Sequence, residues 1–181
     1  MAKQFQEIGD EHRAFIARQH IFFVASASAD SRVNVSPRST NCLRLLGPLA
    51  ADYLDRTGSG NETAAHSRAG GRVTVMFCAV EGAPSILRPY GRASVHNRRG
   101  TGFRHMIERY FCGAAPLGTH QIVELAVELV QTSFGFGVPL FDCRGERDAM
   151  DLWAERRGER VSRHIGGRRT RSASTACRPV C

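Results

Sequence analysis

The stretch 53–66 combines residue types that can bind an anion. A short apolar strand is expected before a turn that holds Gly58 and Gly60, and a helix is expected to begin at Asn61 or Glu62. Small residues allow the backbone to approach an anion, and the free N–H groups and positive dipole end of a new helix would point at it. Four nearby arginines could complete such a site: Arg32, Arg38, Arg56 and Arg68. The stretch is therefore a candidate phosphate cradle.

The same residues also fit an ordinary turn between a strand and a helix. In that interpretation Asn61 caps the helix and the two glycines supply the bend. Neither common phosphate pattern is present, because GxGxxG needs three glycines at fixed spacing and a Walker loop ends in Gly-Lys-Ser/Thr. On these residues alone the ordinary turn is the commoner case, and both interpretations stay open.

Polar residues also alternate along an early segment. On a strand over 32–36, Arg32, Asn34 and Ser36 would share one face, with Val33 and Val35 on the other. The polar face could line a cleft. In antiparallel hairpins, however, such a face is more often simply solvated.

The elements that would position these residues are mostly short strands joined by tight turns. Strands are expected over 21–26, 32–36, 43–46, 50–54, 72–78, 86–96 and 120–132, and helices over 5–20, 61–69, 102–110 and 147–157. Pro37 should end the pairing of its strand, and Gly91 should mark a bulge or a bend. The pattern predicts a mainly β fold with peripheral helices, an antiparallel barrel that is closed or partly closed. A cofactor would then lie outside the barrel or between two copies.

Composition is that of a soluble globular protein. The chain has 181 residues, 42% hydrophobic and 23% charged, and no apolar run approaches the length that spans a bilayer. We expect a domain over 1–158 and an Arg-rich, disordered tail over 159–181, because residues 160–181 hold six arginines and no acid. The tail lacks the interleaved aromatic residues that stack on bases, so binding to nucleic acid is not predicted.

The cysteines suggest neither a metal site nor a disulfide framework. They are widely spread, at Cys42, Cys78, Cys112, Cys143, Cys177 and Cys181. No pair has the C-x-x-C spacing and no histidine stands at zinc-finger spacing from one. Free thiols and a cytoplasmic location are the simplest expectation, and no metal is expected.

Several motifs, in order, resemble the pyridoxamine 5′-phosphate oxidase-like flavoproteins. The resemblance covers the chain from Phe15 to about Gly158. It is carried by His20-Ile21-Phe22-Phe23-Val24-Ala25, Arg32-Val33-Asn34-Val35-Ser36-Pro37, Tyr53-Leu54-Asp55, Thr57-Gly58-Ser59-Gly60-Asn61-Glu62-Thr63, Leu87-Arg88-Pro89-Tyr90-Gly91 and Gln131-Thr132-Ser133.

The resemblance implies a split β-barrel that binds FMN at the interface of a homodimer. It implies that the strand carrying Arg32 to Arg38 faces the flavin, that the turn from Gly60 to Thr63 takes the phosphate, that Arg88 flanks the ring and that residues 131–133 come from the neighbouring subunit. The implied cofactor-binding residues are Arg32, Asn34, Ser36, Arg38, Asp55, Gly60, Asn61, Thr63, Arg88, Gln131 and Ser133. No side chain is assigned as catalytic.

The chain also departs from that family. It has Ser36-Pro37-Arg38-Ser39 where relatives often have Ser-Pro-Lys-Gly. The arginine keeps the positive charge but replaces the compact ammonium of lysine by a planar guanidinium. Phe134 is bulkier than expected beside a flavin, and no C-terminal Arg-x-His element for a pyridoxamine phosphate is found. We therefore expect an FMN-dependent oxidoreductase acting on an unidentified small organic substrate or electron donor. The alternative is a non-catalytic FMN carrier or flavin-based sensor.

Overall fold

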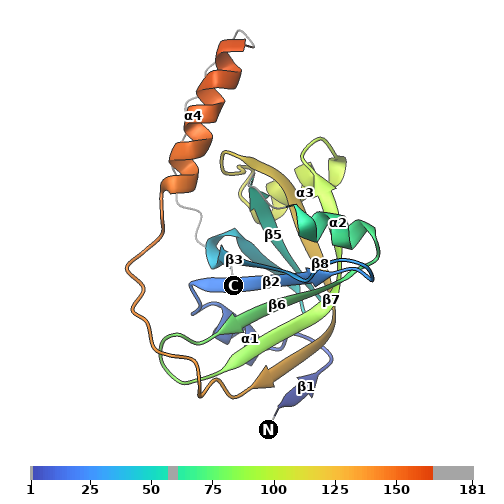
Figure 1. The fold of residues 1–181 in the computed structure, drawn as a ribbon, viewed down its shortest axis with the longest axis vertical. Helices are drawn as coiled ribbons and strands as arrows, with labels where there is room; N and C mark the ends of the chain where they lie inside the picture. Colours follow the sequence, from blue (N-terminus) through green and yellow to red (C-terminus); the bar gives the residue numbers. More distant parts are fainter. Residues whose placement is uncertain (1, 57–60, 165–181) are drawn as a thin grey trace.

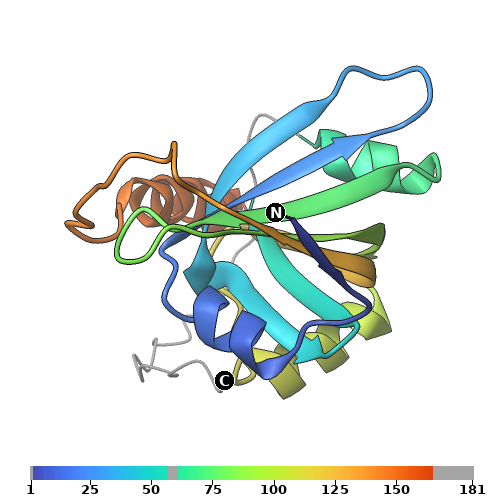
Figure 2. The same ribbon diagram turned by 90° about the horizontal axis from the view of Figure 1, so that it is seen from below.

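The structure, a computed structural model, describes residues 2–56 and 61–164, with the backbone alone at 157 and 159–164. One antiparallel sheet dominates it, in the order β3-β2-β6-β7-β8-β5-β4, with β1 paired to β8 (Figure 1). The strands are β1 (Lys3–Phe5), β2 (Ile21–Ala27), β3 (Asn34–Ser39), β4 (Leu43–Gly47), β5 (Ala50–Arg56), β6 (Arg72–Cys78), β7 (Ile86–Asn97) and β8 (Thr119–Ser133). The sheet curls into an open, split barrel, visible from below in Figure 2. The expected mainly β, partly closed barrel is confirmed.

Helices lie at the periphery of the sheet. They are α1 (Asp10–Ile16), α2 (Glu62–Arg68), α3 (Thr101–Tyr110) and α4 (Ala149–His164), with a 3-10 turn η1 (Thr40–Cys42) between β3 and β4. The expected helix over 5–20 is too long, because α1 covers only Asp10–Ile16 and Phe5 pairs with β8 instead. Helix α4 continues past residue 157 and crosses the expected boundary between 158 and 159. Residues 165–181 of the expected tail lie outside the described residues. No described helix is long and apolar enough to cross a membrane.

The hydrophobic core has two parts. Inside the curl, Phe22 packs edge-on against Tyr53 with ring centroids 5.9 Å apart, and it also contacts Phe77. On the outer face, α3 packs its apolar side on Leu54 of β5 and Ile122 of β8. Because side chains alternate along a strand, β5 is buried on both faces. Both faces of β5 are therefore covered by other elements.

Of the two expectations about irregular positions in strands, the one for Pro37 is wrong and the one for Gly91 is confirmed. Pro37 lies within β3, opposite Phe23, so the expectation that it ends pairing there is wrong. β3 is an edge strand, where a residue without an N–H donor is tolerated. The bulge expected at Gly91 is confirmed by a register shift between Tyr90 and Gly91. A Cβ at residue 91 would lie 1.9 Å from the Ala126 carbonyl oxygen, so only glycine fits.

The cysteine expectation needs one correction. Cys42, Cys78 and Cys143 are free thiols, but Cys112 is disulfide-bonded. A disulfide depends on the distance between two α-carbons in the folded chain, which spacing along the sequence does not reveal.

Candidate functional site

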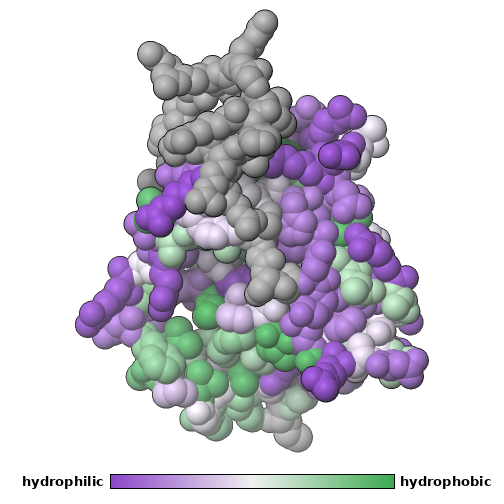
Figure 3. Space-filling view, turned by 45° about the horizontal axis from the view of Figure 1, so that its top comes forward, coloured by the Kyte–Doolittle hydropathy of each residue, from purple (hydrophilic) through white to green (hydrophobic). Residues whose placement is uncertain are grey.

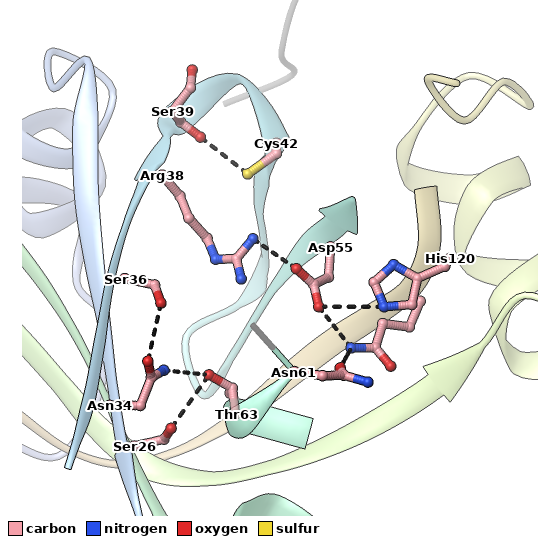
Figure 4. Close-up of polar contacts among 11 residues, drawn as sticks. Ser26, Asn34, Ser36, Arg38, Ser39, Cys42, Asp55, Asn61, Thr63 and His120 are labelled. Carbon is pink, nitrogen blue, oxygen red and sulfur yellow. Dashed lines mark hydrogen bonds and ion pairs between the residues drawn. The ribbon is translucent and has the colours of Figure 1, made fainter. Parts of the chain in front are cut away.

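Three polar side chains of β3 face α2 and β5. Asn34, Ser36 and Arg38 share a face because they are two residues apart on a strand (Figure 4). The Asn34 amide donates to the Thr63 hydroxyl oxygen at 3.2 Å, and the Ser36 hydroxyl donates to Asn34 Oδ1 at 3.3 Å. The Ser26 hydroxyl of β2 donates to the same Thr63 oxygen at 3.3 Å. The expected polar face of this strand therefore lines the interior of the site.

Arg38 and Asp55 form the centre of this site. The guanidinium Nη1 lies 2.7 Å from Asp55 Oδ1, with 19% of the Arg38 side chain and 5% of the Asp55 side chain exposed. The other carboxylate oxygen accepts a 2.6 Å hydrogen bond from the Gln121 amide, which also donates to Asn61 Oδ1 at 2.9 Å (Figure 4). His120 Nε2 is 3.8 Å from the same carboxylate oxygen. Asp55 thus holds the Arg38 guanidinium in place.

Two buried nitrogen atoms in this site, Arg38 Nε and His120 Nδ1, have no hydrogen-bond partner among the described residues, and the Tyr53 hydroxyl is a buried donor beside Thr63. The Arg38 guanidinium stands over the Tyr53 ring, 4.6 Å from its centroid. Burial raises the pKa of the Tyr53 phenol, so it stays a protonated donor at neutral pH. An unpaired buried donor costs roughly 1–3 kcal/mol. A set of one guanidinium, one phenol, hydroxyls and amides fits an anionic group such as a phosphate.

Asn61 stands at the N-cap position of α2 but its side chain does not cap the helix. Its side-chain Oδ1 instead accepts from the Gln121 amide. The ordinary-turn interpretation, in which this side chain caps the helix, is therefore wrong on that point. Gly60, which was assigned to the same turn, lies outside the described residues.

A second polar cluster lies on β7 and β8. Arg88 Nη1 donates to the Ser133 hydroxyl oxygen at 2.9 Å, and the Tyr90 hydroxyl donates to Gln131 Oε1 at 2.9 Å. Across β6 and β2, Arg88 stands in register with Pro37, so its side chain lies on the opposite face of the sheet from that of Arg38. One copy of the chain therefore does not bring the Arg88 cluster to the Arg38 cluster.

Arg32 is not part of either cluster. It precedes the first residue of β3 and its side chain is exposed. The sequence interpretation also missed three members of the Arg38 cluster: Ser26, Gln121 and His120. Their contacts depend on the pairing of β5 with β8 and on the packing of α2 against β2, and no local pattern reveals either.

Comparison with known proteins agrees with this fold. Residues 8–134 match the family model described as pyridoxamine 5′-phosphate oxidase. The chain is thus a split-barrel protein with a polar cluster at the open side of the barrel. It belongs to the pyridoxamine 5′-phosphate oxidase family.

One curated relative is the pyridoxamine 5′-phosphate oxidase family protein ustO of Aspergillus flavus, 37% identical over 142 residues. The match covers 76% of this chain and 56% of the relative, so this chain spans little more than half of that protein.

Two solved structures share the fold. Group A Streptococcus HupZ superposes with a TM-score of 0.53 at 19% identity, over 67% of this chain and 91% of that chain. A pyridoxamine 5′-phosphate oxidase-related, FMN binding protein of Nostoc punctiforme superposes with a TM-score of 0.52 at 9% identity, over 72% and 85% of the two chains.

Proposed function

We propose that the chain binds FMN, with the phosphate end of the cofactor held by the Arg38 cluster. The observation that carries the proposal is the buried Arg38 Nε, which has no hydrogen-bond partner among the described residues, on a guanidinium that lies over the Tyr53 ring. Asn34, Ser36, Asn61 and Thr63 would supply neutral partners around the phosphate, and Gly60 its backbone. Asp55 would orient Arg38 rather than touch the anion, because two negative groups in contact repel each other.

The proposal includes a homodimer with the flavin at its interface. Since Arg88 and its partner Gln131 lie on the opposite face of the sheet from Arg38, a second copy is proposed to deliver Arg88, Gln131 and Ser133 to the same flavin. Large apolar side chains are exposed beside both clusters: Val33, Val35, Phe134 and Phe136. Figure 3 shows hydrophobic residues gathered at the lower end of the face it presents. Such exposed apolar groups are typical of surfaces that another chain covers.

Bound flavin would supply the redox chemistry, while the chain supplies position and charge. Arg88, with its guanidinium held by Ser133, and Arg32 are the cations proposed to lie near the ring, where positive charge stabilises the reduced, anionic flavin. We propose that the protein acts in this way as a flavin-dependent oxidoreductase on a small organic substrate, in the cytoplasm.

An FMN carrier or sensor is the second candidate function. Phe134 and Phe136 stack with ring centroids 4.8 Å apart and planes 9° apart, directly after Ser133. If this pair covered the open face of the ring, a substrate would be excluded.

The test is a visible spectrum of the protein purified without added cofactor, repeated after reconstitution with FMN. The proposal expects two flavin bands and release of free FMN on denaturation. Consumption of a reduced nicotinamide with a quinone acceptor would favour the oxidoreductase over the carrier. A colourless protein that takes up no added FMN would contradict both candidates.

A further inference from the structure

A hollow lies between β1 and α1, apart from the Arg38 cluster. Its volume is about 240 Å³, and no described residue assigned to the flavin lines it. Pockets for drug-sized ligands measure roughly 300–1,000 Å³, so this β1–α1 hollow suits a smaller molecule. Its apolar lining comes from Phe5, Phe15 and Leu87, and its polar lining from Lys3, Glu11, His12, Ser85 and Thr132.

The pairing of β1 with β8 turns one row of side chains toward this hollow. Lys3 stands opposite Thr132, and Thr132 stands opposite Leu87 of β7. Leu87 is buried in the core inside the curl, and residues opposite one another on neighbouring strands share a face. Lys3 and Thr132 therefore lie on that inner face. Gln131 and Ser133 have the alternate orientation and lie on the other face.

Helix α1 forms the other wall of the hollow. Glu11 and Phe15 are four residues apart, so their side chains lie on one flank of the helix, and both line the hollow. His12 lies between this flank and the core and is buried. Its ring packs edge-on against Phe5, with the ring centroids 4.6 Å apart. The strand and the helix thus each bring one charged residue and one aromatic residue to the hollow.

The His12 imidazole is held in one tautomer. The Gly9 backbone N–H donates to His12 Nδ1 at 3.0 Å, so Nδ1 is an acceptor and the ring hydrogen is on Nε2. This Nε2 is buried and has no hydrogen-bond partner among the described residues. A buried donor without a partner is costly, and a ligand oxygen in the hollow would supply the missing acceptor.

The two charged residues at the hollow have opposite signs. Within the described part of the chain, neither Lys3 nor Glu11 takes part in an ion pair. A ligand with a single charge would meet one residue of like charge in the hollow. A ligand that carries both a carboxylate and an ammonium can place each group near a residue of opposite charge.

From this geometry we infer that the β1–α1 hollow binds a small zwitterion with an apolar body, an amino acid with an aliphatic side chain. Lys3 and His12 Nε2 hold the carboxylate, and Glu11 holds the ammonium. The apolar body lies against Phe5 and Phe15. The site is separate from the flavin site and does not depend on the proposed cofactor.

Leucine and two analogues that each lack one of its charges are suitable probes. The analogues are 4-methylpentanoate, which lacks the ammonium, and 3-methylbutylamine, which lacks the carboxylate. Ligand-observed NMR compares their affinities for the full chain. Leucine should bind about fivefold more tightly than either analogue, because it makes both charged contacts. Equal binding of the three molecules, or no binding of leucine, would overturn the inference, and this comparison needs no variant.

Two variants assign the charged contacts. Lys3→Gln should weaken leucine about fivefold without weakening 3-methylbutylamine, which has no carboxylate to lose. Glu11→Gln should weaken leucine about fivefold without weakening 4-methylpentanoate, which has no ammonium. Since both side chains are exposed, the variants should fold, and circular dichroism verifies that they do.

Glu7→Gln is the matched control for Glu11→Gln. Glu7 is exposed between β1 and α1 and lies outside the described lining of the hollow. Its substitution should change the affinity for leucine less than about twofold. Equal effects of Glu7→Gln and Glu11→Gln, or a variant that weakens both analogues alike, would contradict the assigned site.

Discussion

The ion pair between Arg38 and Asp55 joins two strands that lie far apart in the order of the sheet. Arg38 is on the edge strand β3, and Asp55 is on β5 near the other edge. The 2.7 Å contact spans the open side of the curled barrel, where no backbone ladder closes it. The pair therefore stabilises the fold and presents a cation in the proposed phosphate site.

Asp55→Asn should destabilise the fold, because it leaves the partly buried Arg38 cation without its counter-charge. Breaking a buried pair from one side costs about 3 kcal/mol. Urea denaturation measures the change in the free energy of unfolding. Glu128→Gln is the control, because its pair with Arg92 is half exposed, at 3.6 Å, and should be worth less than about 1 kcal/mol. Equal losses in the two variants would contradict a special role for the Arg38 pair.

Stability should depend on pH through Asp52. Burial raises the pKa of this carboxyl from 3.8 to about 7; Arg44 opposes the rise and Glu124 adds to it. Since the folded state holds the proton more tightly than the unfolded state, the contribution to stability is complete below about pH 4 and is lost as pH rises to 7. Asp52→Asn should remove this dependence and raise stability at pH 8 by roughly 2–4 kcal/mol.

Thermal denaturation of the wild type and Asp52→Asn from pH 4 to pH 8 tests this expectation. The two curves should diverge as pH rises. Parallel curves would show that Asp52 ionises normally in the folded protein.

Gly91→Ala should disrupt the pairing of β7 with β8. The new methyl group would meet the Ala126 carbonyl at 1.9 Å, and overpacking of this kind against the backbone costs about 3 kcal/mol or more. Gly47→Ala in β4 is the control, since nothing lies within 4 Å of a Cβ there. Circular dichroism melting compares the two, and similar melting temperatures would refute the assigned close approach.

Phe136→Ser should weaken the proposed homodimer and, with it, FMN binding. The Phe136 side chain is 75% exposed and stands next to the Arg88 cluster, so its substitution should leave the monomer fold intact. Leu49→Ser, at an exposed turn between β4 and β5, is the matched control. Sedimentation velocity should show more monomer for the first variant only. A dimer unchanged by Phe136→Ser would place the interface elsewhere.

The sequence was most informative where a pattern is local. Alternation from Val123 to Leu129 correctly predicted the strand β8, and Gly91 correctly marked the bulge. The polar face of β3 was also read correctly, apart from Arg32, which precedes the strand. The prediction that Pro37 ends the pairing of its strand was wrong, because an edge strand tolerates proline and the order of the strands could not be known from the sequence.

Contacts between side chains of different strands could not be predicted from the sequence. Asp55 was proposed as a cofactor residue, but its ion pair with Arg38 and its bond with Gln121 arise only when β3, β5 and β8 come together in the curl.

The most direct measurement for the central claim is an equilibrium titration of FMN, by quenching of flavin fluorescence, into wild type, Arg38→Gln and Arg72→Gln. Arg72 is exposed on β6, so Arg72→Gln removes the same charge as Arg38→Gln at a position outside the proposed site. Wild type and Arg72→Gln should bind equally, and Arg38→Gln at least tenfold more weakly, because a charge-assisted contact to the phosphate is lost. Equal affinity of all three proteins, or no binding by any, would contradict a phosphate site at Arg38.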